Sequence, residues 1–203
     1  MSKRAQKKTN STRASAPSLR IIGGEFRGRK LRYHGEPRTR PMKDRVREAV
    51  FNLIGPAIID KQVIDLFAGT GALGLEAISR GALGAVFVEH HFPTAELIRQ
   101  NITTLGVEGQ CEVMAGDTFL WARRNLPLPD CETVVLCSPP YDFYVDRHHE
   151  MLELIQRFLD RAGAGWMFVV EADERFDFGD LPNAANWDVR SYPPAVVGML
   201  TKK

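Results

Sequence analysis

The sequence predicts an α/β protein built on a Rossmann-like sheet that is mostly parallel, with seven strands and an antiparallel last strand. Apolar strand-like runs alternate with helix-like stretches from residue 61 onward, which is typical of a parallel sheet covered by helices on both faces. A glycine-rich turn joins the first of these strands to the first helix. The C-terminal segment holds two strand-like runs joined by a Pro-Pro turn, which predicts an antiparallel pair.

Three parts are expected along the 203 residues, a length that suits one main domain with a small extension. Residues 1–18 are rich in Lys, Arg, Ser and Thr and lack aromatic and large aliphatic side chains, so we expect a disordered basic arm. Residues 19–56 are the N-terminal extension, a small basic β-hairpin and a helix that would contact RNA. The main domain covers 57–203.

The extension begins with R-I-I-G-G-E-F-R-G-R-K-L at 20–31, where short apolar runs and three glycines predict a twisted hairpin. The stretch T-R-P-M-K-D-R-V-R-E-A-V-F-N-L-I at 39–54 predicts a loop that leads into a helix, because its apolar residues recur at helical spacing. Asp44 is the expected N-cap of this helix. Arg45 and Arg47 lie off the apolar stripe and are expected to face solvent or phosphate.

The main domain then alternates strand and helix. We expect strands at 63–67, 85–89, 111–114, 133–137 and 166–171. We expect helices between them at 73–80, 93–105, 118–125 and 144–161. The last two strands are expected at 186–192 and 195–201.

The composition disfavours several classes of protein. No apolar run is long enough to cross a membrane and no secretion signal is evident, which favours a cytoplasmic location without membrane contact. The three cysteines show no metal-ligand spacing, and no carboxylate or thiolate partner recurs near His90 and His91. We therefore expect no metal site and interpret most histidines as surface residues.

Positive charge is concentrated at the N-terminal end. Residues 1–50 hold fifteen Lys or Arg against four acids, whereas the remainder holds twelve against twenty-one. This asymmetry is typical of a surface for a polyanion, most simply nucleic acid, while a solvated tail that keeps the protein soluble is the alternative. The candidate RNA-binding residues are Arg20, Arg27, Arg29, Lys30, Arg40, Lys43 and Arg45.

The segment V-I-D-L-F-A-G-T-G-A-L-G-L-E-A at 63–77 carries a nucleoside-cofactor motif. Gly69, Gly71 and Gly74 satisfy G-x-G-x-x-G in a strand, turn and helix setting, so a nicotinamide dinucleotide must be considered. Asp65 argues against it, because a carboxylate near this turn would repel a pyrophosphate. S-adenosylmethionine carries an ammonium and a sulfonium and no phosphate, so D-x-F-x-G-x-G favours it.

Further cofactor candidates follow the next two strands. Glu89 ends one strand and could accept hydrogen bonds from ribose hydroxyls of either cofactor. Asp117 follows the third strand and could accept from an adenine amino group, although an acid there is also an ordinary helix N-cap. Phe67, Thr70 and His90 complete the candidate cofactor-binding set.

The segment S-P-P-Y at 138–141 predicts a clamp for a planar group with an exocyclic amine. Ser138 and the carbonyl of Pro139 would accept hydrogen bonds, Pro140 helps to stiffen the loop, and Tyr141 would stack on a base. Acceptors around the amine free its lone pair for attack on a methyl group. The alternative is that Pro-Pro only ends a buried strand. With the glycine motif before it, the segment predicts methyl transfer to a nucleobase amine.

With these motifs in place, the chain resembles the RsmD family of bacterial 16S ribosomal RNA guanine-N2 methyltransferases. The blocks at 20–31, at 39–52 and at 65–77, together with L-P-N-A-A-N-W at 181–187, carry the resemblance. It implies a Rossmann-like, S-adenosylmethionine-dependent methyltransferase fold with a small N-terminal hairpin. Its site residues would then be those singled out above, with the cofactor at the glycine motif and guanine at 138–141.

One position departs from this family, which usually has Asp or Asn where Ser138 begins the clamp. Serine keeps an acceptor but loses a charge, and Asp142 is a conceivable source of a carboxylate. The leading expectation is methylation of a guanine N2 in 16S ribosomal RNA of an assembling small subunit, without an obligate protein partner. The alternatives are an amino-methyltransferase that acts on DNA or another RNA, and a non-catalytic RNA-binding assembly factor.

Overall fold

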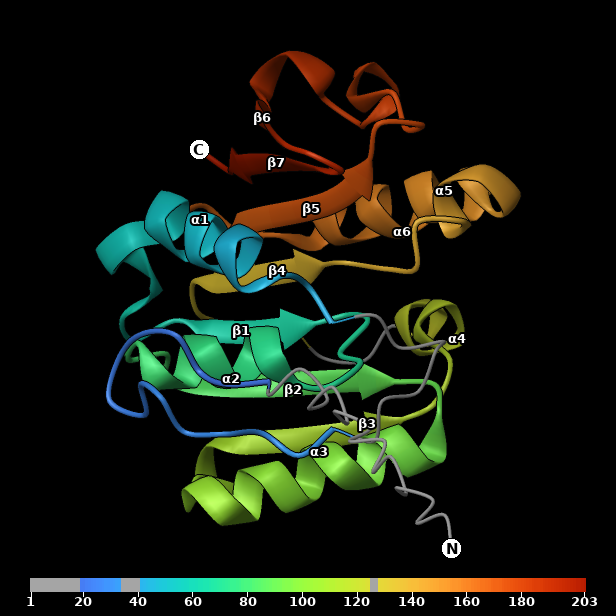
Figure 1. Ribbon diagram of the computed structural model, residues 1–203. Helices are drawn as coiled ribbons and strands as arrows, with labels where there is room; N and C mark the ends of the chain where they lie inside the picture. Colours follow the sequence, from blue (N-terminus) through green and yellow to red (C-terminus); the bar gives the residue numbers. More distant parts are fainter. Residues whose placement is uncertain (1–18, 34–40, 125–127) are drawn as a thin grey trace, which may run out of the picture.

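The computed structural model describes residues 19–33, 41–124 and 128–203 (Figure 1). The predicted basic arm at 1–18 and Arg40 lie outside these residues. Within the described part, no helix is both long and apolar enough to cross a membrane.

The predicted seven-stranded, mostly parallel sheet is confirmed, with strand order β3-β2-β1-β4-β5-β7-β6. Strands β1 to β5 pair in parallel, and β7 is antiparallel to both β5 and β6. The strands are β1 (Gln62–Asp65), β2 (Gly84–Glu89), β3 (Cys111–Ala115), β4 (Thr133–Cys137), β5 (Met167–Asp173), β6 (Asp188–Tyr192) and β7 (Ala195–Thr201).

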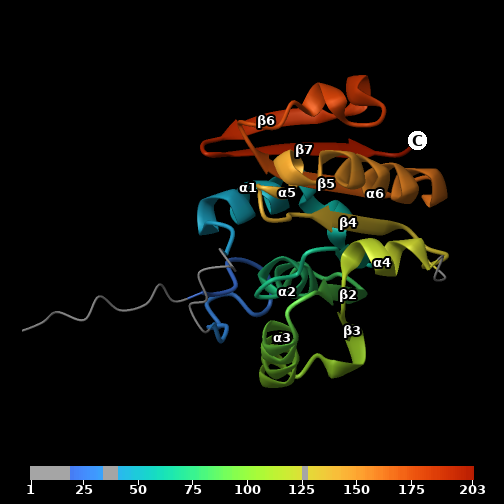
Figure 2. The same cartoon turned by 90° about the vertical axis from the view of Figure 1, so that its right-hand side faces the viewer.

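Helices cover both faces of this sheet. Figure 2 shows α1, α2 and α3 on one face, with α4 and α6 on the other. The α-helices are α1 (Asp44–Ile54), α2 (Ala72–Ser79), α3 (Phe92–Leu105), α4 (Thr118–Arg123), α5 (Phe143–Asp146) and α6 (His148–Arg161). Short 3-10 helices lie at η1 (Gly55–Ile58), η2 (Glu108–Gln110), η3 (Phe178–Asp180) and η4 (Ala184–Asn186).

The prediction of a single helix at 144–161 is wrong, because Arg147 interrupts the helix and separates α5 from α6. This residue has φ −128° and ψ 32°, outside the helical region. Its guanidinium lies 3.8 Å from the ring centroid of Phe119, a cation–π contact that an uninterrupted helical pattern in the sequence does not reveal.

The core consists of two apolar layers, because neighbouring residues of a strand point to opposite faces. Val63 and Val134 pack in the layer with α1, α2 and α3. Ile64 and Val135 pack in the layer with α4 and α6. Because β1 to β5 are parallel, their carboxyl ends meet at one edge of the sheet.

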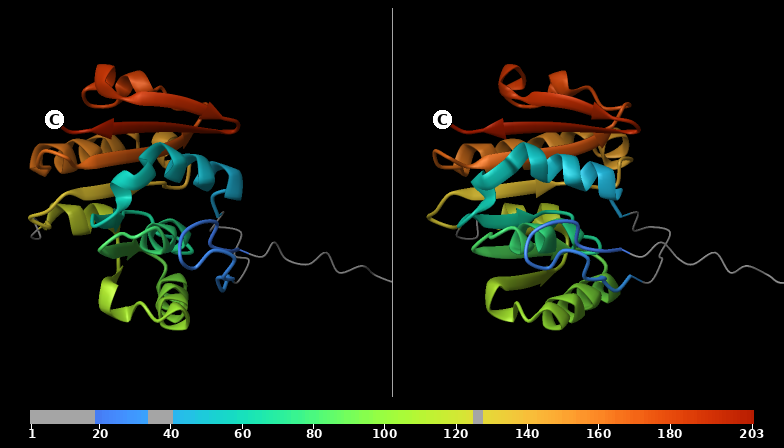
Figure 3. Two further views of the ribbon diagram at one scale, coloured as in Figure 1. Left: turned by 90° about the vertical axis from the view of Figure 1, so that its left-hand side faces the viewer. Right: turned by 60° about the vertical axis from the view of Figure 1, so that its left-hand side comes forward.

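The N-terminal segment at 19–33 folds back on itself, with Arg20 and Lys30 forming an antiparallel bridge. Its predicted hairpin is therefore confirmed only as two short arms and a turn. Glu76 of α2 accepts hydrogen bonds from the backbone amides of Ile22 (2.8 Å) and Gly23 (2.7 Å). These bonds fix the segment to α2, and Figure 3 shows both on the same side of the sheet.

The predicted orientation of Arg47 toward solvent is wrong. Its side chain is fully buried and donates to the backbone oxygen of Arg20 (2.7 Å) and to Asp44 (2.9 Å). The predicted N-cap is also wrong, because Lys43 occupies that position and Asp44 is the first residue of α1. Periodicity alone did not reveal that the N-terminal segment covers this face of α1.

Candidate active site

A cavity of ≈650 Å³ opens where strands β1, β2, β4 and β5 end. Its wall includes Gly69 after β1, Glu89 at the end of β2, Ser138 after β4 and Glu171 on β5. Open α/β sheets bind ligands in this place, outside the carboxyl ends of the strands where the strand order reverses. The volume lies within the roughly 300–1,000 Å³ of small-molecule sites.

The glycine motif forms the predicted turn from β1 into α2. Gly71, the N-cap of α2, has φ 75°, a left-handed conformation that favours glycine. Gly74 lies against β2, where an added Cβ would be 2.3 Å from the ring of Phe87. The third glycine of the motif therefore permits close packing of the helix on the sheet.

Asp65 lies beneath this turn and is fully buried. Its Oδ2 accepts from the amide of Gly74 at 3.2 Å, and among the described residues its Oδ1 has no hydrogen-bond partner. Burial raises the pKa of Asp65 to about 7. The described cavity wall does not include Asp65, Thr70 or Gly71, so Asp65 supports the turn rather than forming part of the wall.

Glu89 connects the turn to β2. Its Oε2 accepts from the amide of Gly69 and its Oε1 from that of His91, both at 2.7 Å. Burial raises the pKa of Glu89, against the opposing effect of these two hydrogen bonds. His90 and His91 line the same wall. Within the described residues, no group of three or more His, Cys, Asp or Glu could hold a metal ion.

Asp117 lines the cavity and is the N-cap of α4, where it accepts from the amide of Leu120 at 2.9 Å. The predicted role of Asp117 as a helix N-cap is thus confirmed. Nearby, the rings of Phe67, Phe119 and Phe143 lie 5.9–6.2 Å apart in an aromatic cluster that also lines the cavity. Only Phe67 was singled out in the sequence, because the cluster joins the loop after β1 to the starts of α4 and α5, which are distant along the chain.

The predicted clamp, Ser138 to Tyr141, lines the same cavity as Gly69 of the glycine turn. Its two hydroxyls converge on one carboxylate: Ser138 donates to Oε2 of Glu171, and Tyr141 donates to Oε1 over 2.8 Å. Glu171 is only 4% exposed, and burial raises its pKa. Glu171 was not among the residues singled out from the sequence, although an acid in the apolar run M-F-V-V-E-A of β5 is a signal that could have revealed it.

Asp142, the other candidate for a clamp carboxylate, is directed elsewhere. Its side chain is 72% exposed and pairs with Arg175 over 2.9 Å. Arg175 also pairs with Asp173 over 2.8 Å at the end of β5. Asp142 therefore belongs to an exposed ion-pair group at the rim of the cavity, while Glu171 contacts the clamp hydroxyls.

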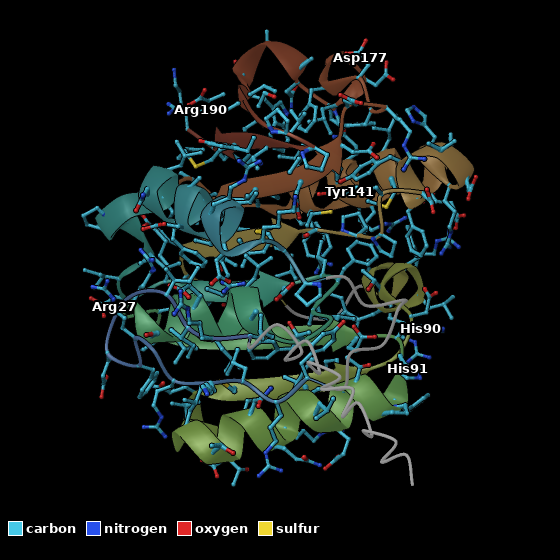
Figure 4. All side chains as sticks on the ribbon, in the orientation of Figure 1. Arg27, His90, His91, Tyr141, Asp177 and Arg190 are labelled. Atoms are coloured by element: carbon cyan, nitrogen blue, oxygen red, sulfur yellow. The ribbon has the colours of Figure 1, made fainter. Side chains whose placement is uncertain are left out.

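The candidate RNA-binding residues that the structure describes lie on the N-terminal segment and at the start of α1. Lys43 lines the cavity, and the exposed Arg45 donates to the backbone oxygen of Pro193. Arg20 pairs with Asp44 over 3.4 Å. Arg27, Arg29 and Lys30 are exposed on the N-terminal segment. Figure 4 shows Arg27 on the opposite side of the molecule from His90 and His91, which line the cavity, so Arg27 lies away from it.

Comparison with known proteins places this geometry in context. Residues 19–190 match the family model described as Conserved hypothetical protein 95. The chain is 39% identical over 176 residues to Ribosomal RNA small subunit methyltransferase D of Escherichia coli strain K12, covering 84% of this chain and 82% of that protein.

Solved structures share the fold. A putative methyltransferase from Escherichia coli aligns with a TM-score of 0.74 and 29% identity, covering 92% of this chain and 98% of that one. An RNA methyltransferase from Salinibacter ruber, solved in complex with S-adenosyl-L-homocysteine, aligns with a TM-score of 0.60 and 18% identity, covering 80% of this chain and 93% of that one. At that identity the second likeness establishes the fold alone.

Proposed function

The chain belongs to the RsmD family of ribosomal RNA methyltransferases, and from this premise we propose that it methylates the exocyclic N2 amino group of a guanine in small-subunit ribosomal RNA. The observation that carries this proposal is the position of Ser138 and Pro139 in the same cavity as Gly69 and Glu89. One cavity can then hold a nucleoside cofactor at the ends of β1 and β2 and a base amine at the end of β4.

The residues around the glycine turn suit S-adenosylmethionine. Glu89 and Asp117 bring acceptors and negative charge to the wall, and the turn above the buried Asp65 presents backbone rather than cationic side chains. These groups match a ligand with an ammonium, hydroxyl groups and an adenine, and they do not match a pyrophosphate. When bound, this cofactor supplies a methyl group on a positively charged sulfur. Glu89 would hold the ribose, and Asp117 and Phe67 would lie by the adenine.

The clamp supplies what an aromatic amine needs. The amine lone pair is delocalised into the ring, and acceptors at its N–H groups favour the tetrahedral nitrogen that can attack. Ser138 and the carbonyl of Pro139 would be those acceptors, and Tyr141 would stack on the guanine, an interaction worth roughly 1–3 kcal/mol per base. The two acceptors bind the amine most strongly as its nitrogen becomes tetrahedral. They would therefore increase the rate of methyl transfer rather than the affinity for the substrate.

The basic N-terminal end supports an RNA substrate. Exposed cations on the segment at 19–33, with Lys43 at the cavity, would follow the phosphate backbone beyond the target nucleotide. The relatives' name, ribosomal RNA small subunit methyltransferase, supports small-subunit ribosomal RNA as the substrate. We propose that the partner is 16S ribosomal RNA in an assembling small subunit.

This function is tested by incubation of the protein with methyl-labelled S-adenosylmethionine and small ribosomal subunits from cells that lack the modification. Label should enter the RNA of these subunits and not that of fully modified subunits, which serve as the matched control. In a parallel reaction with DNA, label in the DNA would favour a DNA amino-methyltransferase. Absence of label from both RNA and DNA, while cofactor and RNA both bind, would favour a non-catalytic RNA-binding assembly factor.

A further inference from the structure

Glu171 brings a buried carboxylate to the clamp from a neighbouring strand. β4 and β5 are parallel neighbours, and Cys137 at the end of β4 is in register with Val170. Ser138 directly follows Cys137, and Glu171 directly follows Val170. Ser138 and Glu171 therefore lie side by side where β4 ends. Both line the cavity, and Oε2 of Glu171 accepts from the Ser138 hydroxyl.

The direction of these hydrogen bonds determines what Ser138 can do. An ionised carboxylate only accepts, so the hydroxyl hydrogens of Ser138 and Tyr141 both point to Glu171. The Ser138 oxygen then keeps its lone pairs for another donor. Hydrogen-bonded groups polarise one another, so a hydroxyl that donates to a carboxylate is a stronger acceptor than an isolated one.

We propose that Glu171 is a positioning residue that makes Ser138 the acceptor of the proton that the substrate amine loses. This inference rests on the proposed function and deepens it. The amine lone pair forms the new nitrogen–carbon bond, while the methyl–sulfur bond breaks and its electron pair stays on sulfur. One amine proton passes to Oγ of Ser138, and the Ser138 hydroxyl proton passes to Oε2 of Glu171, which later releases it to water.

Two observations favour Glu171 over the other acids near the clamp. Asp142 and Asp173 are both engaged by Arg175, whereas Glu171 contacts Ser138 directly. Burial also raises the pKa of Glu171, which strengthens this carboxylate as a proton acceptor. The carboxylate that the family usually carries at the first clamp position is thus supplied here from β5.

Other titratable groups are packed around Glu171, from the clamp, from β4, from β5 and from α5. Tyr141 donates to it from the clamp, and Asp173 follows it on β5. Tyr144 of α5 is buried, which raises its pKa well above the ordinary value. Burial raises the pKa of Cys137, at the end of β4, to about 12. Both of these groups therefore stay neutral where an activity profile is measured.

The test is Glu171→Gln, which keeps the shape of the side chain and removes its capacity to take a proton. The kcat of methyl transfer should fall on the order of 10²-fold, as for loss of general base catalysis. The affinity for S-adenosylmethionine should hardly change. Wild-type kcat should fall as pH is lowered through the Glu171 pKa, because the carboxylate must be ionised. This fall is the acid limb of the plot of kcat against pH, and the variant should lack it. The control is Glu174→Gln, the same change at an exposed position three residues later.

A rescue experiment separates this role from a merely structural one. Ser138→Asp in the Glu171→Gln background places a carboxylate directly at the amine and should recover most of the lost kcat. Ser138→Ala and Glu171→Gln should not be additive, because both interrupt one proton path. If Glu171→Gln does not fold, as judged by its melting curve, Ser138→Ala alone should remove the acid limb.

The outcomes distinguish this inference from the function on which it rests. An active wild type whose Glu171→Gln or Ser138→Ala variant keeps the kcat and the acid limb would overturn the inference and leave the function standing. A wild type that binds S-adenosylmethionine and RNA but transfers no methyl group would overturn the function, and this inference with it.

Discussion

The backbone amide of Gly69 donates to Oε2 of Glu89 over 2.7 Å. This bond joins the glycine turn after β1 to the end of β2, so two loops that are 20 residues apart form one wall of the cavity. The other oxygen of Glu89 holds the amide of His91. Glu89 thus shapes the proposed cofactor site in addition to its proposed contact with the ribose.

Glu89→Ala should weaken S-adenosylmethionine binding by about 10-fold or more, because it removes hydrogen bonds of a charged group worth about 1.5–3 kcal/mol each. Isothermal titration calorimetry measures this affinity. Glu112→Ala, an exposed acid on the adjacent β3, is the matched control and should bind as the wild type does. If the two variants bind S-adenosylmethionine with equal affinity, Glu89 does not contribute to cofactor binding.

The wild type should show no saturable binding of NADH, because the Asp65 carboxylate beneath the glycine turn would repel a pyrophosphate held there. The same calorimetric titration compares NADH with S-adenosylmethionine. Tight NADH binding would reverse the cofactor assignment.

Asp65 should make the protein less stable as pH rises. Its pKa is raised from 3.8 to about 7 in the folded protein, so the folded state binds more protons than the unfolded state between these values. The stability from its protonated form is complete below about pH 4 and is lost by about pH 7. Asp65→Asn keeps an acceptor for the Gly74 amide and removes this titration. Its melting temperature should exceed that of the wild type by several degrees at pH 8 and by less at pH 5. An equal difference at both pH values would contradict this assignment.

Arg47→Ala should lower the free energy of unfolding by about 3 kcal/mol or more, because it removes a buried charge that lies 3.7 Å from the buried Glu76. Urea unfolding measures the loss. Arg45→Ala, two positions earlier and exposed on the same helix, is the control and should cost much less. Similar losses would show that the buried network contributes little.

Replacing Arg27, Arg29 and Lys30 together by Ala should weaken RNA binding and reduce the slope of log affinity against log salt by about 0.7–0.9 for each lost phosphate contact. Cofactor affinity should not change, because none of these three residues lines the cavity. Replacement of Arg124, Arg157 and Arg161, which lie with α4 and α6 on the other face, is the control. A wild-type salt slope in the first variant would identify the segment as a solubility device.

Much of this fold was predictable because its signals are local. The alternation of strand and helix, the glycine turn and the C-terminal pair are each encoded within a short stretch of sequence. The positions of Ser138 and Glu89 followed from their places after buried strands. Arg47 and Glu171 were not predictable in this way, because their partners lie on distant segments. Burial of Arg47 depends on Arg20 and Glu76, and the role proposed for Glu171 depends on the adjacency of β4 and β5.

The identity of the methylated atom is the most direct test of the proposed function. Small-subunit RNA labelled by the wild-type protein can be digested to nucleosides and separated by liquid chromatography with mass spectrometry. We expect the label in N2-methylguanosine, and at least about 10-fold less of it from the Ser138→Ala variant at equal cofactor occupancy. Label in a methylated adenosine or cytidine, or full activity in that variant, would contradict this expectation.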